Sequence, residues 1–498
     1  SFRVTFNINA GALYKINETK LILPIDYDPE NFLNVQKLLD EFKGKHYSFL
    51  KVSKIVDAID KVSLSREYDF ITAEIIEEKI NIDKLDLIFK VSESEKLYVE
   101  EINILGNNVT EESVIRSHLE VDEGDPFNEL LHAKSLNKIK SLNIFKKVVS
   151  DVVDGSAPAT KIINISIEEK PTGEISLGAG VGSDGATVGF SVSENNFLGK
   201  GVQLSSSLRL GSDTVRGNFT INNPNFNYTG RSLYTNISST KIDKIDTSGY
   251  DSAVNDVSFG TAYEKFENLY FRPSVSISSE KITTNSTASA PLQKQAGSFF
   301  ETRFGYSLDY DLRDRSYQTK SGTRSKFTQG IPIISDDNAL LNSYEFTKWH
   351  QFENKMVSDL GFYLSAIESL TNEDVKVSSR LHLPKRKLRG FQTGKLGPVD
   401  NNDYVGGNYA ASINFNTSLP MVMPSLEKVD FNYFVDVGNL WGVDYSATVD
   451  QSNSVRASTG LGINYITPIG PMSFTLAHNL IKADTDKTKF FSFNLGTT

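Results

Sequence analysis

The dominant pattern in this chain is an alternation of apolar and polar residues that continues from Lys170 to Thr498. In the stretch 429–437 every odd-numbered residue is apolar or aromatic, whereas the even-numbered residues include Asp430 and Asp436. A period of two places these two sets on opposite faces of a β-strand. The alternation repeats without intervening helices and without an apolar stretch long enough for a spanning helix. It therefore favours a transmembrane β-barrel over a soluble β-sandwich.

The two ends of this region predict a weak seam where the barrel closes. We expect the first strand over residues 173–182 and the last over residues 489–498, where Phe491 and Phe493 share one face and Asn494 lies on the other. Glycine gives a strand no side chain to pack, and near a strand end it permits a bend. The glycines concerned are Gly173, Gly178 and Gly180 in the first strand and Gly496 in the last.

Residues 1–170 contain a weak internal repeat, in which Leu13-Tyr14 recurs as Leu97-Tyr98 and each pair opens a short strand. Apolar residues at spacings of three and four then predict a helix with one buried face in each copy. These residues are Val52, Ile55, Val56 and Ile59 in the first copy and Leu131, Leu136, Ile139 and Leu142 in the second. Paired strands close each copy, over residues 70–76 and 85–91 in the first and over residues 148–153 and 161–167 in the second.

The expected order in each copy is therefore βααββ. This order predicts two modules, over residues 1–95 and 96–170, followed by a barrel over residues 171–498. Pro171 marks the joint, because proline ends ladder pairing. Modules of this size bury only small cores and leave edge strands that can accept another strand through backbone hydrogen bonds. Such edges suit the binding of unfolded polypeptides.

Composition narrows the function without deciding it. The net charge of −10 argues against nucleic-acid binding. The six histidines are scattered without ligand spacing, and no nucleophile, zinc or phosphate-loop motif is present. We therefore expect neither an enzyme nor a metal or other cofactor. The chain starts at Ser1 without the pattern of a signal peptide, so we expect a mature or trimmed chain.

Short motifs along the barrel region carry a family resemblance. They are residues 195–201 (NNFLGKG), 388–391 (LRGF), 405–408 (VGGN), 434–438 (FVDVG), 470–474 (GPMSF) and 491–496 (FSFNLG). In order and spacing they resemble the BamA family of outer-membrane assembly proteins, and the resemblance covers nearly the whole chain. It implies α+β polypeptide-transport-associated (POTRA) modules of βααββ order in the periplasm. An all-β, sixteen-stranded antiparallel transmembrane β-barrel in the bacterial outer membrane follows them.

The resemblance also implies a loop over about residues 370–404 that folds back into the barrel lumen. Its motif is Leu388, Arg389, Gly390 and Phe391. Asp436 matches an acidic lumenal position of the family and is the expected partner of Arg389, whereas a second acidic position aligns with Asn416. An Arg–Asp pair predicts that exchanging the two charges preserves part of the contact.

By the same resemblance, the seam is a lateral gate through which a client strand enters the membrane. Its residues are Gly173, Ser176, Gly178 and Gly180 in the first strand and Phe491, Phe493, Asn494 and Gly496 in the last. We expect a crosslink between Ser176 and Asn494 to block the gate. In the second module, Glu123 matches a position through which the family contacts a periplasmic lipoprotein.

The leading functional hypothesis is an insertase that binds unfolded outer-membrane protein precursors and folds them into the membrane at the gate. The implied partners are these precursors, periplasmic lipoproteins of an assembly complex and outer-membrane lipid. A transporter of the two-partner secretion type, which exports a client through the pore, is the first alternative. A passive diffusion porin is a more remote one.

Overall fold

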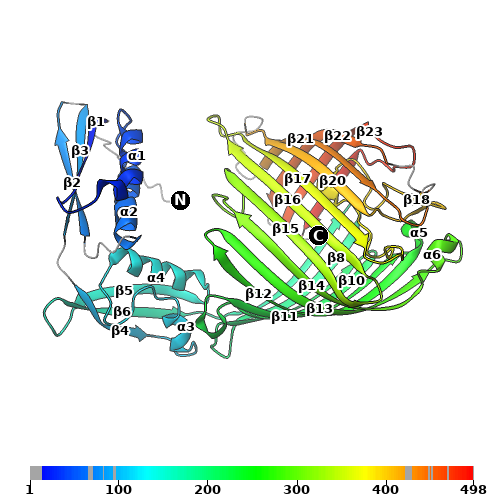
Figure 1. Cartoon of the computed structure of the whole chain (residues 1–498), viewed down its shortest axis with the longest axis horizontal. Coiled ribbons are helices and arrows are strands. Elements are labelled where there is room, and N and C mark those ends of the chain that lie inside the picture. Colours follow the sequence, from blue (N-terminus) through cyan, green and yellow to red (C-terminus); the bar gives the residue numbers. More distant parts are fainter. Residues whose placement is uncertain are drawn as a thin grey trace, which may run out of the picture. The chain divides into compact units, whose positions relative to one another are not determined.

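The computed structural model describes residues 14–65, 71–81, 83–93, 97–420, 429–446, 449, 453–467 and 470–496. Leu13, Phe70, Thr497 and Thr498, which belong to predicted elements, lie outside the described residues. The chain divides into two compact units, Ser1–Pro171 and Thr172–Thr498. Each unit is described by itself, and Figure 1 shows their elements.

The N-terminal part of the first unit is a three-stranded sheet with helices. Its elements in order are β1 (Lys15–Ile22), a short 3-10 helix (Pro29–Phe32), α1 (Leu33–Phe42), α2 (Phe49–Ser65), β2 (Ile71–Lys79) and β3 (Lys84–Glu93). The sheet order is β1-β3-β2, with β1 parallel and β2 antiparallel to β3. This arrangement confirms the predicted βααββ order.

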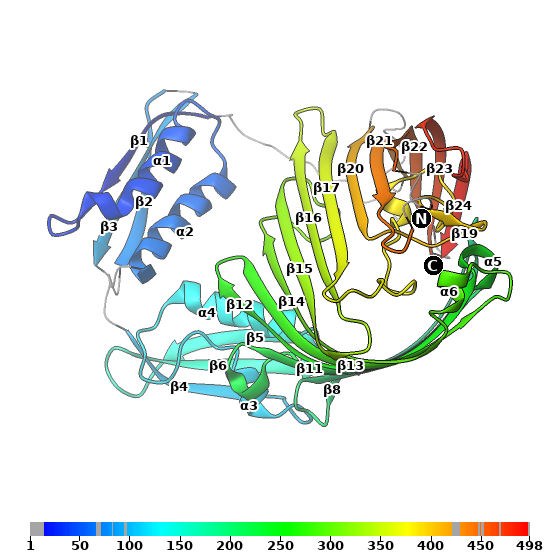
Figure 2. The same cartoon turned by 45° about the vertical axis from the view of Figure 1, so that its right-hand side comes forward.

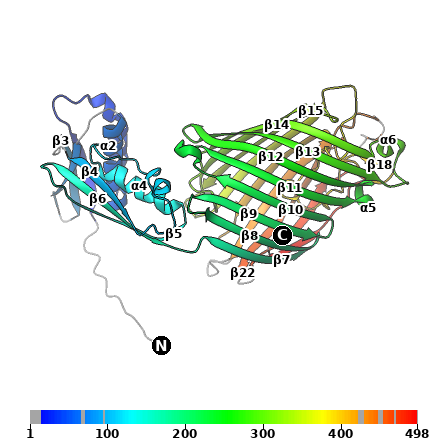
Figure 3. The same cartoon turned by 90° about the horizontal axis from the view of Figure 1, so that it is seen from below.

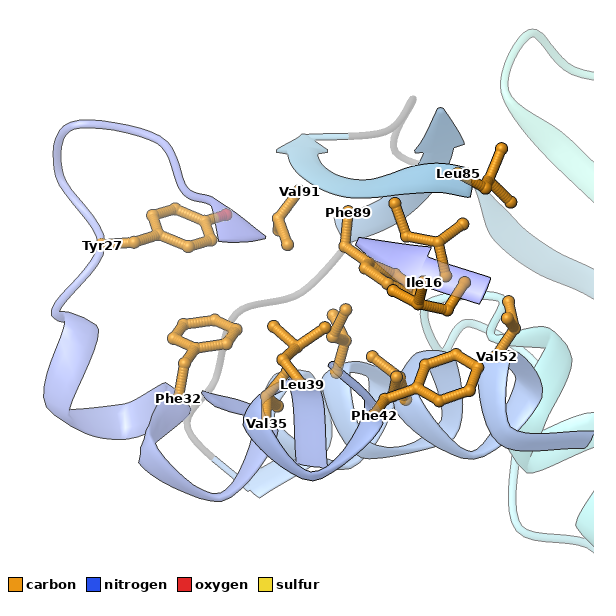
Figure 4. Packing of buried hydrophobic residues seen from close by; sticks show 13 residues of the cluster. Ile16, Tyr27, Phe32, Val35, Leu39, Phe42, Val52, Leu85, Phe89 and Val91 are labelled. Carbon is orange, nitrogen blue, oxygen red and sulfur yellow. The ribbon is translucent and has the colours of Figure 1, made fainter. Parts of the chain in front are cut away.

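The helices of this module bury their apolar faces against one face of its sheet (Figures 2 and 4). On β3 the alternate residues Leu85, Leu87, Phe89 and Val91 point into the core. Val52, Ile55 and Ile59 of α2 are buried there as predicted, and Val56 packs at the edge of the core. Each fully buried Leu or Phe stabilises such a small core by about 1.5–3 kcal/mol.

The second module repeats this design. Its elements are β4 (Tyr98–Leu105), α3 (Glu112–Arg116), α4 (Glu129–Ser141), β5 (Phe145–Asp154) and β6 (Thr160–Glu169), in the sheet order β4-β6-β5. Asn128 caps α4, because its Oδ1 accepts a hydrogen bond from the backbone N of Leu131 at 3.0 Å. Ile139 lies fully within the core, and the other predicted residues of this helix face pack around it.

The second unit is a closed antiparallel barrel of sixteen strands, as predicted. The strands are β7 (Gly173–Gly182), β8 (Gly185–Phe197), β9 (Val202–Gly211), β10 (Thr214–Asn223), β11 (Ser232–Lys244), β12 (Tyr250–Phe266), β13 (Leu269–Thr284), β14 (Gly297–Asp311), β15 (Gly322–Ser335), β16 (Ala339–Gln351), β17 (Val357–Ser369), β20 (Tyr409–Ser418), β21 (Val429–Trp441), β22 (Arg456–Thr467), β23 (Gly470–Ile481) and β24 (Phe491–Gly496). Figure 3 shows β7 to β14 side by side along one wall.

The wall has an apolar exterior and a polar lumen. Ile175 and Leu177 of β7 point outward and are strongly exposed, whereas Asp436 and Ser458 point inward and are fully buried. This confirms the alternation that the sequence predicted for a membrane barrel. No described helix is long and apolar enough to cross a membrane.

The longest connection between described strands lies at one end of the barrel. At the end where β7 begins, which we call the module end, β12 joins β13 through residues 267–268 alone. At the opposite end, which we call the loop end, residues 370–408 join β17 to β20. This lumenal loop contains a short 3-10 helix (Lys385–Lys387) and the short strands β18 (Val399–Asp400) and β19 (Asp403–Tyr404). Two short helices, α5 (Ile245–Ser248) and α6 (Ala290–Gln293), also lie at the loop end (Figure 2).

Candidate functional site

Arg389 of the lumenal loop binds Asp436 of β21 through a two-point ion pair. Its Nε lies 2.7 Å from Oδ2 of Asp436 and its Nη2 lies 2.7 Å from Oδ1. The backbone N of Arg389 also donates to Oδ2 of Asp436 at 3.0 Å. Bidentate contacts of this kind fix both the position and the angle of a guanidinium. The structure thus brings together the two residues that the resemblance paired.

Two asparagines of β20 complete this site. Asn414 Nδ2 donates to Oδ1 of Asp436 at 2.8 Å and to the backbone O of Lys387 at 2.8 Å. Asn416 Oδ1 accepts from Nη2 of Arg389 at 2.7 Å, and its Nδ2 donates to Oδ2 of Asp359 at 2.8 Å. Asn416 is therefore an uncharged acceptor for Arg389 and connects it to Asp359.

The aromatic ring of Phe434 packs against the guanidinium of Arg389. The Cζ atom of Arg389 lies 3.7 Å from the ring centroid of Phe434, whose side chain is fully buried. A cation over an aromatic face gains electrostatic attraction in addition to packing. Phe434 precedes Asp436 by two residues and so shares its face of β21, which is the signal by which the sequence could have revealed this contact.

The other residues of the motif fix the loop in the lumen. Gly390 has a φ of +87°, and a Cβ there would lie 3.0 Å from Cβ of Ala477, so only glycine fits without strain. Leu388 and Phe391 are buried together in an apolar cluster with Leu440. The motif therefore combines one charged anchor with an apolar one.

The loop also pairs with the segment that leads into β24. Phe391 forms an isolated β-bridge with Thr488, and the backbone N of Lys489 donates to O of Gly390 at 2.8 Å. The same segment is fastened by Arg456, whose Nε lies 2.9 Å from Oδ2 of Asp486. Both side chains of that ion pair are 0% exposed. The path of the last strand is thus fixed by the lumenal loop and by the barrel wall.

The seam between β7 and β24 is short within the described residues. Three register pairs join the strands, Asn494 with Gly182, Leu495 with Val181 and Gly496 with Gly180. On the other side of β7, every residue from Gly173 to Gly182 pairs with β8. Three of the expected gate residues in β7 lie nearer its N-terminal end than these pairs, namely Gly173, Ser176 and Gly178. Asn494 is paired with Gly182 and not with Ser176.

The backbone at Gly496 closes the seam in a conformation that requires glycine. Its φ is +86°, and a Cβ there would lie 2.3 Å from the backbone O of Ala179. Phe491 and Phe493 stack on the outer face of β24, with ring centroids 6.2 Å apart. The two phenylalanines lie in the first half of β24, and Gly496 is its last described residue.

The turn between β7 and β8 extends the seam beyond β7. The backbone N of Ser183 donates to O of Phe493 at 3.0 Å, and the N of Phe493 donates to Oγ of Ser183 at 2.8 Å. Asp184 forms ion pairs with Lys489 and with Lys385 of the lumenal loop. Burial opposes the ionisation of Asp184, but the hydrogen bonds from the two lysines outweigh it and lower its pKa. Nothing in the sequence marks this contact.

Comparison with known proteins assigns the barrel to a family. Residues 196–498 match the Omp85 superfamily domain, which is more than half of the chain. The chain belongs to the Omp85 superfamily. Residues 97–170 match the surface antigen variable number repeat, a POTRA module, so the second module of this Omp85 protein is a POTRA module.

The relatives of this Omp85 chain include several proteins named outer membrane protein assembly factor BamA. The chain is 26% identical to BamA from Neorickettsia risticii, over 83% of this chain and 56% of that protein. It is 25% identical to BamA from Neisseria meningitidis, over 93% of this chain and 64% of that protein. The chain thus spans between half and two thirds of the length of these relatives.

Solved structures share the fold. BamA from Haemophilus ducreyi lacking POTRA domains 1–3 superposes with a TM-score of 0.72 at 20% identity, over 97% of this chain and 100% of that one. CdiB from Acinetobacter baumannii superposes with a TM-score of 0.53 at 14% identity, over 98% and 91% of the two chains. The two structures show the fold, a β-barrel preceded by POTRA modules, and the relatives above agree with the expected location in the outer membrane. The Omp85 assignment also agrees with the expectation that the chain is not an enzyme.

Glu123, the expected partner-binding residue, lies in the POTRA module next to α3. Its Oε1 accepts from the backbone N of Ile102 at 3.0 Å and lies 3.5 Å from Nη1 of Arg116. The side chain of Glu123 remains 48% exposed. It therefore orders the start of this module and still presents a carboxylate to solvent.

Proposed function

We propose that this chain is an outer-membrane protein assembly factor that folds β-barrel precursors into the membrane at the seam between β7 and β24. The observation that carries the proposal is the contrast between the two edges of β7. One edge pairs with β8 along its whole length, whereas the described part of β24 covers only Gly180, Val181 and Gly182. A client strand can pair with the part of this edge that no described residue covers, through backbone hydrogen bonds, and no nucleotide is needed because client folding supplies the free energy.

The proposed gate residues fall into two groups. Gly180, Asn494 and Gly496 belong to the pairs that must break when the seam opens, and Phe491 and Phe493 lie on the outer face of the strand that moves. Gly173, Ser176 and Gly178 lie on the edge that the client strand meets first. This edge begins at the module end, where a client held by the POTRA modules arrives.

Capture of clients is the proposed task of the N-terminal unit. The outer strands are β1 and β2 in the first sheet and β4 and β5 in the second, so each sheet offers edges for an added strand. The proposed role of Glu123 is to bind a periplasmic lipoprotein of the assembly complex through its half-exposed carboxylate.

Export through the pore, as in two-partner secretion, is less well supported. The loop motif fills part of the lumen, with Leu388 and Phe391 buried and Arg389 paired. A chain passing through the pore must first release all of these contacts. Entry at the seam breaks the pairs between β7 and β24, in which Leu388, Arg389 and Phe391 take no part.

The test is to fasten the seam and to measure insertion. Val181→Cys with Leu495→Cys places two thiols on register partners of the outer face, and a short bifunctional thiol reagent can join them in the full chain in liposomes. Leu177→Cys with Phe190→Cys is the matched control, because it joins β7 to β8 on the same face. We expect the first crosslink to stop insertion of an unfolded barrel precursor and the control to leave it unchanged. Insertion at the control rate through a joined seam rules out the gate.

The same assay separates export from insertion. Export delivers the client to the aqueous phase beyond the membrane, whereas insertion leaves it folded in the bilayer. Protease added after the liposomes are dissolved in mild detergent distinguishes the two products, because a folded barrel resists cleavage and an exported unfolded chain does not.

A further inference from the structure

The lumen contains a cavity of about 480 Å³ whose wall is rich in cations. Six basic side chains line it, Arg313, Arg324, Lys326, Arg386, Lys387 and Arg389. The acidic residues in its lining are Glu345 and Asp359. A cavity of this size holds a ligand of a few amino-acid residues and is too small for a folded domain.

The cavity lies toward the module end of the barrel. Arg324 and Lys326 follow the first residue of β15, and Trp349 and Asp359 lie on either side of the β16–β17 turn. In an antiparallel barrel these strand ends share the end at which β7 begins. The tip of the lumenal loop reaches this depth and contributes Arg386, Lys387 and Arg389 from above.

Four of the six cations are already neutralised. The pairs are Arg313 with Asp311, Arg324 with Asp309, Lys387 with Glu345, and Arg389 with Asp436. Arg386 and Lys326 form no ion pair or side-chain hydrogen bond with any described residue. The cavity therefore presents two cations that take part in no ion pair between described residues, Arg386 from the loop tip and Lys326 from the barrel wall. Lys326 lies between its register partners Asp309 and Glu345, which already bind Arg324 and Lys387.

We propose that this cavity binds a carboxylate of an unfolded polypeptide, with Arg386 and Lys326 as the residues that bind it. The proposal rests on the proposed function, which brings unfolded chains to the module end. Charge complementarity selects an anion, and the planar fork of Arg386 matches a carboxylate. A lipid headgroup is excluded by its acyl chains, which cannot cross the barrel wall. The carboxylate comes from an Asp or Glu side chain or from a chain terminus.

Binding of labelled peptides to the full chain in detergent micelles tests this assignment. The probe is a fluorescent, unstructured hexapeptide with two Glu residues and an amidated C-terminus, followed by fluorescence anisotropy at low salt. A second probe has Gln in place of Glu and a free C-terminal carboxylate, and a third has neither carboxylate. Binding of the first or the second probe identifies the source, and equal binding of the third overturns the proposal.

Substitution of the two free cations locates the site. Lys326→Gln with Arg386→Gln breaks no ion pair between described residues, so the barrel is expected to fold, and far-ultraviolet circular dichroism checks this. We expect binding of the carboxylate probe to weaken by about tenfold, which corresponds to about 1.4 kcal/mol. Lys348→Gln is the matched control, because Lys348 lies on β16 next to Trp349 but points outward. Unchanged affinity in the double variant, or equal loss in the control, overturns the assignment.

A competition experiment identifies the chemical class. Succinate, a dicarboxylate, should displace the peptide at least as well as inorganic sulfate does, since the two competitors carry equal charge. If sulfate displaces the peptide at a lower concentration than succinate, the cavity prefers tetrahedral oxyanions and the carboxylate assignment is wrong.

The failure of this proposal can be distinguished from failure of the proposed function. Peptide binding is measured without a bilayer and in the chain with a joined seam. Charge-dependent binding together with insertion through a joined seam leaves the cavity assignment standing and removes the gate. Blocked insertion together with unchanged binding in Lys326→Gln/Arg386→Gln overturns the cavity assignment and leaves the proposed gate standing.

Discussion

Lys385 of the lumenal loop places its Nζ 2.6 Å from Oδ2 of Asp184, although 201 residues separate them in the chain. Asp184 lies in the turn between β7 and β8 and also binds Lys489, two residues before β24. One carboxylate therefore connects the first hairpin, the last strand and the loop. Opening of the seam must break at least the contact with Lys489.

Removing this carboxylate should loosen the seam. In Asp184→Asn both lysines lose their ion-pair partner, although Lys489 keeps its hydrogen bond to the backbone O of Ser183. We expect amide hydrogen exchange of residues 491–496 to accelerate by about twofold to tenfold, since the ion pairs are partly exposed. Asp213→Asn is the control, because Asp213 lies in the next turn at the same end of the barrel. Equal exchange in the two variants contradicts a role for Asp184 in holding the seam.

The same contact predicts a dependence on pH. The pKa of Asp184 is lowered in the folded protein, so its contribution is fully present above the ordinary value of 3.8 and is lost as the pH falls through the lowered value. We expect seam exchange, corrected for the intrinsic rate, to rise only below about pH 4. In Asp184→Asn this rise should be absent. A rise near pH 6 would point to another group.

Truncation of the loop anchor should release the loop. Arg389→Ala leaves Asp436 buried, fully unexposed and without its guanidinium, which costs about 3–5 kcal/mol for a buried pair. We expect cleavage of residues 370–404 by proteinase K to accelerate by about a hundredfold or more. Lys395→Gln changes a cation of the same loop that forms no side-chain ion pair within the described chain and should leave cleavage unchanged.

Exchanging the two charges is not expected to restore the anchor. Asp436 also accepts hydrogen bonds from the backbone N of Arg389 and from Nδ2 of Asn414. An arginine at position 436 offers these donors no acceptor, so Arg389→Asp with Asp436→Arg leaves buried donors unpaired. The sequence predicted partial rescue because it revealed the charge pair and not the donors around it. Protection from proteinase K at the level of the unmodified chain would contradict this view.

Glycine at the seam is required by its conformation. Gly496→Ala places a Cβ 2.3 Å from O of Ala179 at a φ of +86°, so β24 must move or leave β7. We expect the yield of the Val181–Leu495 crosslink to fall severalfold, given a cost of about 1–3 kcal/mol. Gly189→Ala on neighbouring β8 meets no atom within 4 Å and should leave the yield unchanged.

The sequence correctly predicted the features that depend on the alternation of polar and apolar residues. It did not predict the features that depend on strand register or on contacts between distant parts of the chain. The alternation of side chains along β21 was enough to predict that Asp436 faces the lumen, because a strand has only two faces. Register is fixed by the whole barrel, and a shift of two residues keeps every face the same. For this reason the sequence offered Ser176 as a neighbour of Asn494, whereas Gly182 lies there. The contacts of Asp184 with two distant lysines depend on the path of the loop, which no local pattern encodes.

The backbone pairing of Gly390 and Phe391 with residues 488 and 489 has a mechanical consequence. The lumenal loop and the segment before β24 are joined by backbone hydrogen bonds, so neither can move alone without breaking them. A small molecule that immobilises the loop from within the lumen should therefore also hold β24 in place, without competing with a client at the lipid-facing surface.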